Sequence, residues 1–269
     1  MHVRPLAPHD LAAALALTAK KPYADCFLAS LLEAGRYRDL IGIFRDGVLV
    51  AIASSLANFV TTDLDDAMAS VLADHLAASA RPAAIVGRRE NVELLWAAID
   101  GRLGLARDRR PEQPLLVLDH APAIAPDPLV RRAEPGEFEA LFPCCVDMFT
   151  HEVGVSPVAN GLERSYRQRV RDTIGAGRSF VRMDGDTVIF KTEIGAVSST
   201  ACQLQGVWVR HDQRGRGIAA PGIAAVALLA MRQFAPAVEL YVNDFNAPAR
   251  RAYARAGFRQ EDTFSTVFL

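Results

Sequence analysis

Two stretches of the chain alternate apolar and polar residues on both sides of an Asp-Gly pair. One is IFRDGVLVAIASS from Ile43, and the other is VRMDGDTVIFKTEIGAVSS from Val181. Alternation places every second side chain on the same face of a strand, and Asp-Gly suits the tight turn between two antiparallel strands. Both stretches are therefore predicted to be β-hairpins.

The patterns around the two hairpins also recur. HVRPLAPHDLAAALAL from His2 resembles LVRRAEPGEFEALFP from Leu129, and RPAAIVGRRENVELLWAAI from Arg81 resembles APAVELYVNDFNAPARRAYARAGF from Ala235. Each copy predicts a strand, helices, a hairpin, a helix, a strand and a helix, in that order. The alternative is a chance similarity between two α+β patterns.

A repeat of this length indicates tandem domains rather than a solenoid. We predict the domains at residues 1–120 and 129–269. Prolines and alanines are frequent in the segment 121–128 between them, which favours a stiff, extended linker.

The composition is that of a globular protein, with 51% hydrophobic and 23% charged residues and a formal net charge of -1. So small a net charge gives no support to a general role on nucleic acid or on an anionic membrane. No window reaches the ~18 uninterrupted apolar residues of a membrane span, and the first residues do not have the pattern of a signal peptide. The cysteines have no metal-ligand spacing, and we expect reduced, buried thiols in a cytoplasmic protein; they are Cys26, Cys144, Cys145 and Cys202.

The sequence DQRGRGIAAPG, from Asp212, joins a predicted strand to a predicted helix. A helix start offers free N–H groups and a positive dipole end, glycines allow close approach, and arginines add charge, so this stretch favours a phosphate or pyrophosphate. The spacing matches neither the P-loop nor the Rossmann fingerprint, and a solvated basic turn is the alternative. In the strand CQLQGVWVRH before the loop, alternation predicts four residues on one face: Gln203, Gln205, Val207 and Val209.

The loop and the segment that follows it resemble one family. The pattern Arg214-x-x-Gly217-x-Ala219 is similar to the (Q/R)-x-x-G-x-(G/A) loop of the GNAT acetyltransferases, and the segment from Asn246 to Tyr253 resembles the strand end and helix that follow that loop. The resemblance covers the second copy. It implies an α/β (α+β) fold of tandem GNAT-like domains, each a mixed, mostly antiparallel sheet flanked by helices. The two-part chain is also similar to actinobacterial GNAT proteins whose first domain has no known function.

The resemblance implies acetyl-CoA as the acyl donor and no metal. The backbone at Val207, Trp208 and Val209 would pair with the pantetheine arm, and Asn246 would contact the cofactor. The pyrophosphate would be held by the amides of the loop, which are those of Arg214, Gly215, Arg216, Gly217, Ile218 and Ala219.

Tyr253 is implied as the general acid that protonates the CoA thiolate. A hydroxyl of pKa ~10 held close to a thiolate of pKa ~8.5 suits this step, and packing of the ring in the core is the alternative. Its seven-residue distance from Asn246 predicts a shared helical face.

Two carboxylates are candidates for work on the amine acceptor. Glu193 is either a general base or acceptor contact, or the partner of Lys191 in a structural salt bridge. Glu152 lies where GNAT proteins line the acceptor entrance and could attract a cationic amine, while the neighbouring His151 could take a proton near neutral pH. The alternative for both is an exposed polar side chain without a role.

The first copy lacks this chemistry. The region that matches the loop reads TTDLDDAMASV from Thr61, without glycine and with three aspartates that would repel a pyrophosphate. Asn91 is present, but Ala98 stands where the tyrosine would be. We expect a degenerate domain that serves contact or acceptor recognition.

The resemblance and these residues predict an acetyl-CoA-dependent N-acetyltransferase in the cytoplasm. The acetyl group would pass by direct attack to an amine acceptor, which is a protein lysine, a protein N-terminus or a small molecule. A non-catalytic acyl-CoA-binding sensor is the alternative. Neither nucleic acid nor a membrane is expected as a partner, and a homodimer is left open.

Overall fold

Asp46 and Gly47 form the turn of the first hairpin, with φ angles of 51° and 82°. These left-handed conformations suit the twist of two antiparallel strands. The second hairpin turns at Gly185, with φ 54°. Both predicted hairpins are confirmed in this computed structural model, which describes residues 1–269.

The predicted order of elements is present in each half of the chain, and each half also has a strand after the hairpin and a final strand that this order lacks. Up to residue 118 they are β1 (His2–Pro5), α1 (Leu11–Thr18), α2 (Cys26–Glu33), β2 (Leu40–Arg45), β3 (Val48–Ser54), β4 (Asn58–Phe59), α3 (Asp66–Ala77), β5 (Ala84–Arg88), α4 (Arg89–Ile99) and β6 (Asp108–Leu118). From residue 131 they are β7 (Arg131–Arg132), α5 (Phe138–Val153), α6 (Glu163–Gly175), β8 (Ser179–Asp184), β9 (Thr187–Val197), β10 (Ala201–Val209), α7 (Ala219–Gln233), β11 (Ala237–Tyr241), α8 (Ala247–Ala256) and β12 (Arg259–Phe268).

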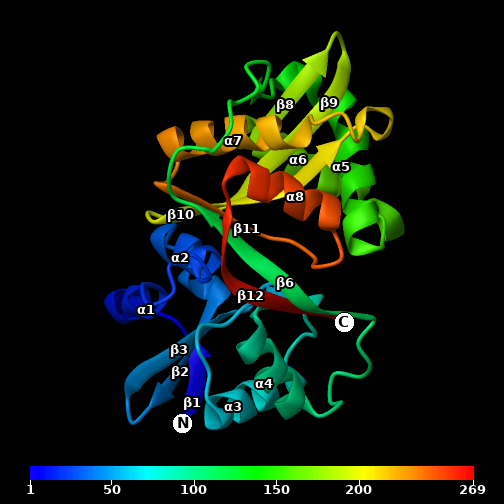
Figure 1. Ribbon diagram of the computed structural model, residues 1–269. Helices are drawn as coiled ribbons and strands as arrows, with labels where there is room; N and C mark the ends of the chain where they lie inside the picture. Colours follow the sequence, from blue (N-terminus) through cyan, green and yellow to red (C-terminus); the bar gives the residue numbers. More distant parts are fainter.

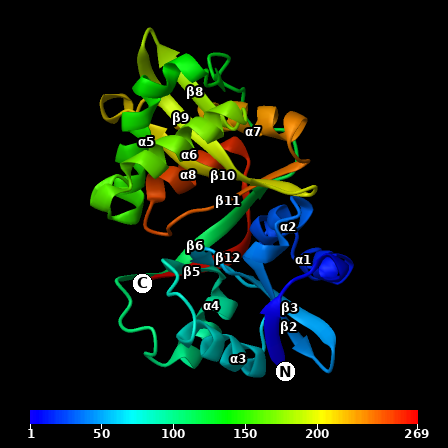
Figure 2. The same cartoon turned by 180° about the vertical axis from the view of Figure 1, so that it is seen from behind.

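Nine strands form one mixed sheet in the order β4-β5-β12-β6-β11-β10-β9-β8-β7, and β1-β2-β3 form a smaller one. An antiparallel bridge between Ala53 and Thr61 links the two sheets. In the second half, α7 and α8 cover one face of the sheet, towards the viewer in Figure 1, and α5 and α6 cover the other, towards the viewer in Figure 2. The predicted fold class, two α/β units with mixed, mostly antiparallel pairing, is confirmed.

The two halves exchange strands. β6 lies between β11 and β12 and is antiparallel to both, while β12 also pairs with β5, from Phe264 opposite Arg88 to Phe268 opposite Ala84. In Figure 1 these two strands, green and red, run between the upper and lower parts of the molecule. Neither half completes its sheet without a strand from the other, and the predicted division at residues 121–128 stays a prediction.

The segment 121–128 packs against the second half. Ala123 N donates to the Ala256 carbonyl of α8 at 2.9 Å, and Asp127 N donates to the Pro221 carbonyl of α7 at 3.0 Å. Asp127 Oδ2 also accepts a hydrogen bond from Arg182 Nη1 at 2.8 Å. The segment is therefore held on the surface that α7 and α8 form.

Each face of the second half buries its own apolar cluster. Small residues let α7 approach the sheet closely: a Cβ built at Gly222 would lie 3.0 Å from the Phe190 ring. Tyr253 belongs to this cluster under α7 and α8, whereas Val181 belongs to the cluster under α5 and α6. Burial of such apolar surface stabilises the fold by about 25 cal/mol per Å².

None of the helices combines the length and the apolar character that crossing a membrane requires. All four cysteines are free. Cys144 is only half-buried, at the margin of the apolar cluster under α5 and α6, so its predicted burial is wrong.

Candidate functional site

β10 and β11 are paired in parallel only along their first residues, from Ala201 opposite Ala237 to Gln203 opposite Glu239. From Leu204 to Val209 the two strands separate. The backbone groups on this edge of β10 are paired by no other strand, and such groups need a partner when they are covered. This edge, together with the loop and helix beyond it, forms the candidate site.

Gly206 interrupts the alternation of β10. It has φ 62° and lies in a register shift of β10 against β9. Leu204 packs with the cluster under α7 and α8 before the shift, and Val207 and Val209 pack with the same cluster after it. A bulge adds one residue and so reverses the alternation. The prediction of a common face is therefore wrong for the four residues Gln203, Gln205, Val207 and Val209.

The loop between β10 and α7 has the predicted form. Gly215 and Gly217 have φ angles of 76° and 79°, which glycine adopts without strain. α7 begins at Ala219 and carries Pro221 in its first turn, where no intrahelical N–H is needed. The first N–H groups of α7 therefore face the loop without helical partners.

The two arginines of this loop are not neutralised by the chain. Arg214 donates from Nε to the Val209 carbonyl at 3.1 Å, and Arg216 is exposed. Neither pairs with a carboxylate, whereas the neighbouring Arg210 is 2.9 Å from Asp212. The start of α7 therefore concentrates positive charge, and its binding of a pyrophosphate stays a prediction.

Trp208 points away from the separated edge. Its Nε1 donates to Asp147 Oδ2 on α5 at 2.7 Å, and His211 Nε2 lies 2.8 Å from the same oxygen. These bonds lower the pKa of Asp147. Trp208 thus offers only its backbone to the edge, as the predicted pantetheine contact requires.

Tyr253 lies on α8 with 6% of its surface exposed. Burial raises the pKa of its phenol above the usual range, and the charge of Glu152 adds to this, so the hydroxyl stays protonated. Asn246 is exposed and caps α8, with Oδ1 accepting from Ala249 N at 3.2 Å. Asn246 is thus the N-cap of α8, and its shared face with Tyr253 stays a prediction.

Glu193 is buried in β9. Its Oε1 accepts hydrogen bonds from Arg169 Nη2 at 2.6 Å and from Gln205 Nε2 at 2.9 Å. Burial opposes ionisation, but the charges of Lys191 and Arg169 outweigh it, so the pKa of Glu193 lies below its usual range. A carboxylate held ionised in this way is a weak base near neutral pH. This environment favours a structural role for Glu193, with Arg169 as its ion-pair partner.

Lys191 is fully buried in β9, and its Nζ has no hydrogen-bond partner. A Cβ built at Gly206 would lie 3.1 Å from this Nζ, so the ammonium sits directly against the bulge. Its charge acts on Glu193 and also opposes the rise in the pKa of Glu152. The predicted salt bridge between Lys191 and Glu193 is therefore wrong, and Arg169 is the ion-pair partner of Glu193.

Glu152 ends α5, where Arg110 Nη2 of β6 donates to its carbonyl at 2.6 Å. The side chain reaches solvent but has many protein atoms around it. This desolvation raises the pKa of the carboxyl, against the charges of Lys191 and Arg110. Glu152 in turn adds to the effect of burial on the pKa of both Tyr241 and Tyr253. Its charge therefore acts on the predicted general acid, and both Glu152 and the neighbouring His151 are exposed.

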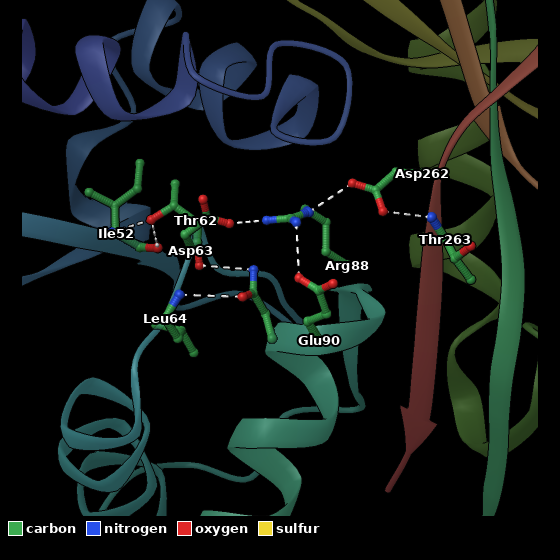
Figure 3. Close-up of polar contacts among 9 residues, drawn as sticks. Ile52, Thr62, Asp63, Leu64, Arg88, Glu90, Asp262 and Thr263 are labelled. Atoms are coloured by element: carbon green, nitrogen blue, oxygen red, sulfur yellow. Dashed lines mark hydrogen bonds and ion pairs between the residues drawn. The ribbon is translucent and has the colours of Figure 1, made fainter.

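In the first copy, ion pairs fill the matching position (Figure 3). Arg88, at the end of β5, binds the carboxylates of Asp63, Glu90 and Asp262, the last at 2.8 Å from Nε. Asn91 bonds to two backbone groups of the loop before α3. A pyrophosphate would meet carboxylates here instead of free arginines. These ion pairs support the prediction that the first copy is degenerate, which stays a prediction.

Some residues of this site were not predicted. A glycine inside a strand pattern indicates a bulge or a close backbone approach, and this signal was present at Gly206. Tyr241, Arg110 and Arg169 come from β11, β6 and α6, and no pattern along the chain brings them together. Across the whole chain, no group of three or more His, Cys, Asp or Glu side chains is arranged to hold a metal ion.

Comparisons with known proteins give two family-model matches and a shared fold. Residues 159–258 match a family model described as the acetyltransferase (GNAT) family, and residues 38–141 match one described as a domain of unknown function, DUF4081. A search of curated protein sequences finds no significant match.

Solved structures with a similar fold cover nearly the whole chain. A GNAT-family acetyltransferase from Colwellia psychrerythraea has a TM-score of 0.59 at 13% identity, with all of both chains covered. A Drosophila protein has a TM-score of 0.71 at 15% identity, covering 99% of this chain and 98% of its own. A tandem GNAT protein from the clavulanic acid biosynthesis pathway has a TM-score of 0.56 at 15% identity, covering 99% and 98%. Identities this low show the shared fold alone.

Proposed function

Because residues 159–258 match the model of the GNAT acetyltransferase family, we propose that the chain binds acetyl-CoA and transfers the acetyl group to an amine. The observation that carries the proposal is the separation of β10 from β11 beyond Gln203. It leaves an unpaired backbone edge on β10 before the start of α7, and Tyr253 belongs to the apolar cluster that Val207 and Val209 pack against.

The cofactor would lie along this edge. The pyrophosphate binds the free N–H groups of α7, and Arg214 and Arg216 add charge-assisted hydrogen bonds. The pantetheine arm pairs with the backbone of residues 207–209. The thioester then reaches the bulge at Gly206, where the strand turns its backbone out of register with β9.

The amine attacks the thioester carbonyl directly, and the tetrahedral intermediate expels the CoA thiolate. We assign the base to Glu152, because its raised pKa and its access to solvent suit proton uptake from an ammonium group. Glu193 keeps the supporting role of an ion-paired carboxylate. Glu152 thus takes the role of base that the sequence suggested for Glu193, and Glu193 keeps only a structural role.

Tyr253 donates the proton to the leaving thiolate. Burial raises the pKa of its phenol, and the same burial raises the proton affinity of a thiolate held beside it. The two effects act in the same direction, which keeps proton transfer between the two groups accessible. The four free cysteines suit a reducing compartment, and we propose a cytoplasmic location.

The variant Tyr253→Phe tests this function. It keeps the ring packed against Phe258 and removes only the hydroxyl, so kcat should fall about 100-fold with acetyl-CoA affinity nearly unchanged. Tyr166→Phe is the matched control, because it also removes a buried hydroxyl, one that donates to the Cys145 carbonyl, and it should leave kcat in place.

Thiol release measured with lysine-rich peptides and with small amines provides the assay. Acetyl-CoA binding without turnover of any amine would favour a non-catalytic sensor. Full activity of the Tyr253→Phe variant would mean that this tyrosine packs in the core and is not the general acid.

A further inference from the structure

A cleft of about 640 Å³ lies between α6 and the strands β9 and β10, and both halves of the chain line it. Arg169 of α6 and Gln205 of β10 belong to its walls and floor, and Arg178 stands just before β8. Arg36 comes from the first half, after α2. Few of the lining residues are apolar, so the cleft suits a polar ligand.

Hydrogen bonds hold the first half of the chain in place beside the cleft. Glu33, the last residue of α2, accepts hydrogen bonds from Ser199 N and Ser199 Oγ, both at 2.7 Å. These bonds hold the end of α2 against the loop between β9 and β10. Arg36, three residues further on, is thereby positioned over the cleft.

The cleft leads to the proposed reaction site. Gln205 lies on its floor one residue before the bulge at Gly206, and its Nε2 donates to Glu193 at 2.9 Å. Gly195 keeps the floor clear, because a Cβ there would lie 2.5 Å from the Gln205 side chain. A molecule in the cleft would therefore present one end to β10 where the thioester is proposed to lie.

Arginine dominates the charge in the cleft. Arg36 and Arg169 each pair with one carboxylate, at 2.6 Å, and the pair of Arg36 is an exposed i,i+3 pair of the kind that contributes little. Arg178 is half-buried and pairs with no carboxylate. Asp172, the one carboxylate of the lining, accepts from a neighbouring amide of α6 at 2.8 Å. An unpaired, partly desolvated guanidinium favours an anionic ligand.

We propose that this cleft binds the acceptor and that the acceptor is an amine carrying a carboxylate or phosphate group. Arg178 and Arg36 hold the anionic group, and the amine points to β10. The inference rests on the proposed acetyl transfer. It also gives the degenerate first half a part in acceptor recognition through Arg36.

The test uses the full chain with acetyl-CoA and pairs of amines that differ in the anionic group. O-phosphoethanolamine is compared with ethanolamine, and L-lysine with cadaverine, so that the two pairs separate phosphate from carboxylate. We expect the anionic member of one pair to be the better substrate by about tenfold or more in kcat/KM. Arg178→Gln and Arg36→Gln should raise its KM about tenfold with kcat nearly unchanged, whereas Arg38→Gln, an exposed neighbour outside the cleft, should change neither.

Equal or better turnover of ethanolamine and cadaverine would overturn the proposal, as would an unchanged KM in both cleft variants. If no amine is turned over, calorimetry with O-phosphoethanolamine and L-lysine on the CoA-saturated protein decides. Absence of binding at millimolar concentration would contradict the proposed acceptor cleft. It would not contradict the proposed acetyl transfer, because acetyl-CoA binding and the effect of Tyr253→Phe are measured separately. Binding that Arg178→Gln abolishes supports it.

Discussion

Arg169 and Glu193 are joined by a hydrogen bond of 2.6 Å between Nη2 and Oε1, although 24 residues separate them in the chain. The bond crosses from α6 to β9 and keeps a carboxylate ionised where only 5% of its side chain is exposed. The Glu152 carboxylate has no such partner. The two acidic residues therefore differ in their surroundings: Lys191 and Arg169 lower the pKa of Glu193, whereas desolvation raises the pKa of Glu152.

Glu152→Gln should lower kcat/KM about 100-fold without changing acetyl-CoA affinity, because it removes the proposed base. Glu193→Gln keeps an acceptor for Arg169 and should lower the melting temperature more than the rate. Steady-state kinetics and thermal unfolding measure the two effects. A large loss of rate in Glu193→Gln with a fully active Glu152→Gln would restore Glu193 as the base.

The same assignment predicts a pH dependence. Glu152 must be ionised to accept a proton, and desolvation raises its pKa, so kcat/KM should decline as the pH falls towards that raised value. The acidic limb should disappear in Glu152→Gln and persist in Glu193→Gln. A pH-rate profile of the three proteins checks this, and an identical limb in all three would assign it to another group.

Gly217→Val should weaken acetyl-CoA binding about tenfold or more, ~1.4 kcal/mol. Its φ of 79° is one that a β-branched residue adopts only under strain, so the loop must change shape. Gly185→Val is the matched control, since Gly185 also has a positive φ and open space around it but lies in the β8–β9 hairpin. Calorimetry should find unchanged affinity in the control, and equal affinity in both variants would contradict the loop assignment.

Glu239 should make stability depend on pH. It is fully buried on β11, its Oε2 has no partner, and burial raises its pKa from 4.5 to about 8. Between these values the folded protein keeps a proton that the unfolded chain releases, so the free energy of unfolding should fall as the pH rises. Glu239→Gln should make this slope smaller. Part of the slope should remain, because burial also raises the pKa of Asp25 to about 8.

Urea unfolding near pH 5 and near pH 8 measures that slope. The exposed Glu261→Gln serves as the control and should behave like the wild type. A slope that Glu239→Gln leaves unaltered would mean that the carboxyl ionises in the folded protein without cost.

Removal of residues 259–269 should abolish cooperative folding in both halves. It deletes the strand that pairs with β5 and β6 and leaves Arg88 without Asp262. Circular dichroism and hydrogen exchange measure the loss. Fragments 1–120 and 121–269 produced together should co-purify as one complex. A fragment 1–120 that folds stably on its own would contradict the prediction, because it would show that the first half does not need β12.

The sequence by itself determined the features that depend on neighbouring residues. Asp46-Gly47 predicts its turn because few residue pairs accept two positive φ angles, and the loop at Gly215 and Gly217 could be recognised because a glycine-rich helix start is a local feature. The aspartates from Asp63 onwards likewise indicated that the first copy has lost its phosphate site.

Only the tertiary structure decided the features that join distant residues. The hydrophobic pattern of β12 suits any sheet, and its pairing with β5 depends on which edges are free once both halves have folded. Alternation in β10 could not locate Val207, because a bulge at Gly206 reverses the faces and its register is set by β9. The charges near Glu152 and Glu193 come from Lys191 and from two arginines on other elements, so their pKa values depend on burial and on distances in space that residue order does not contain.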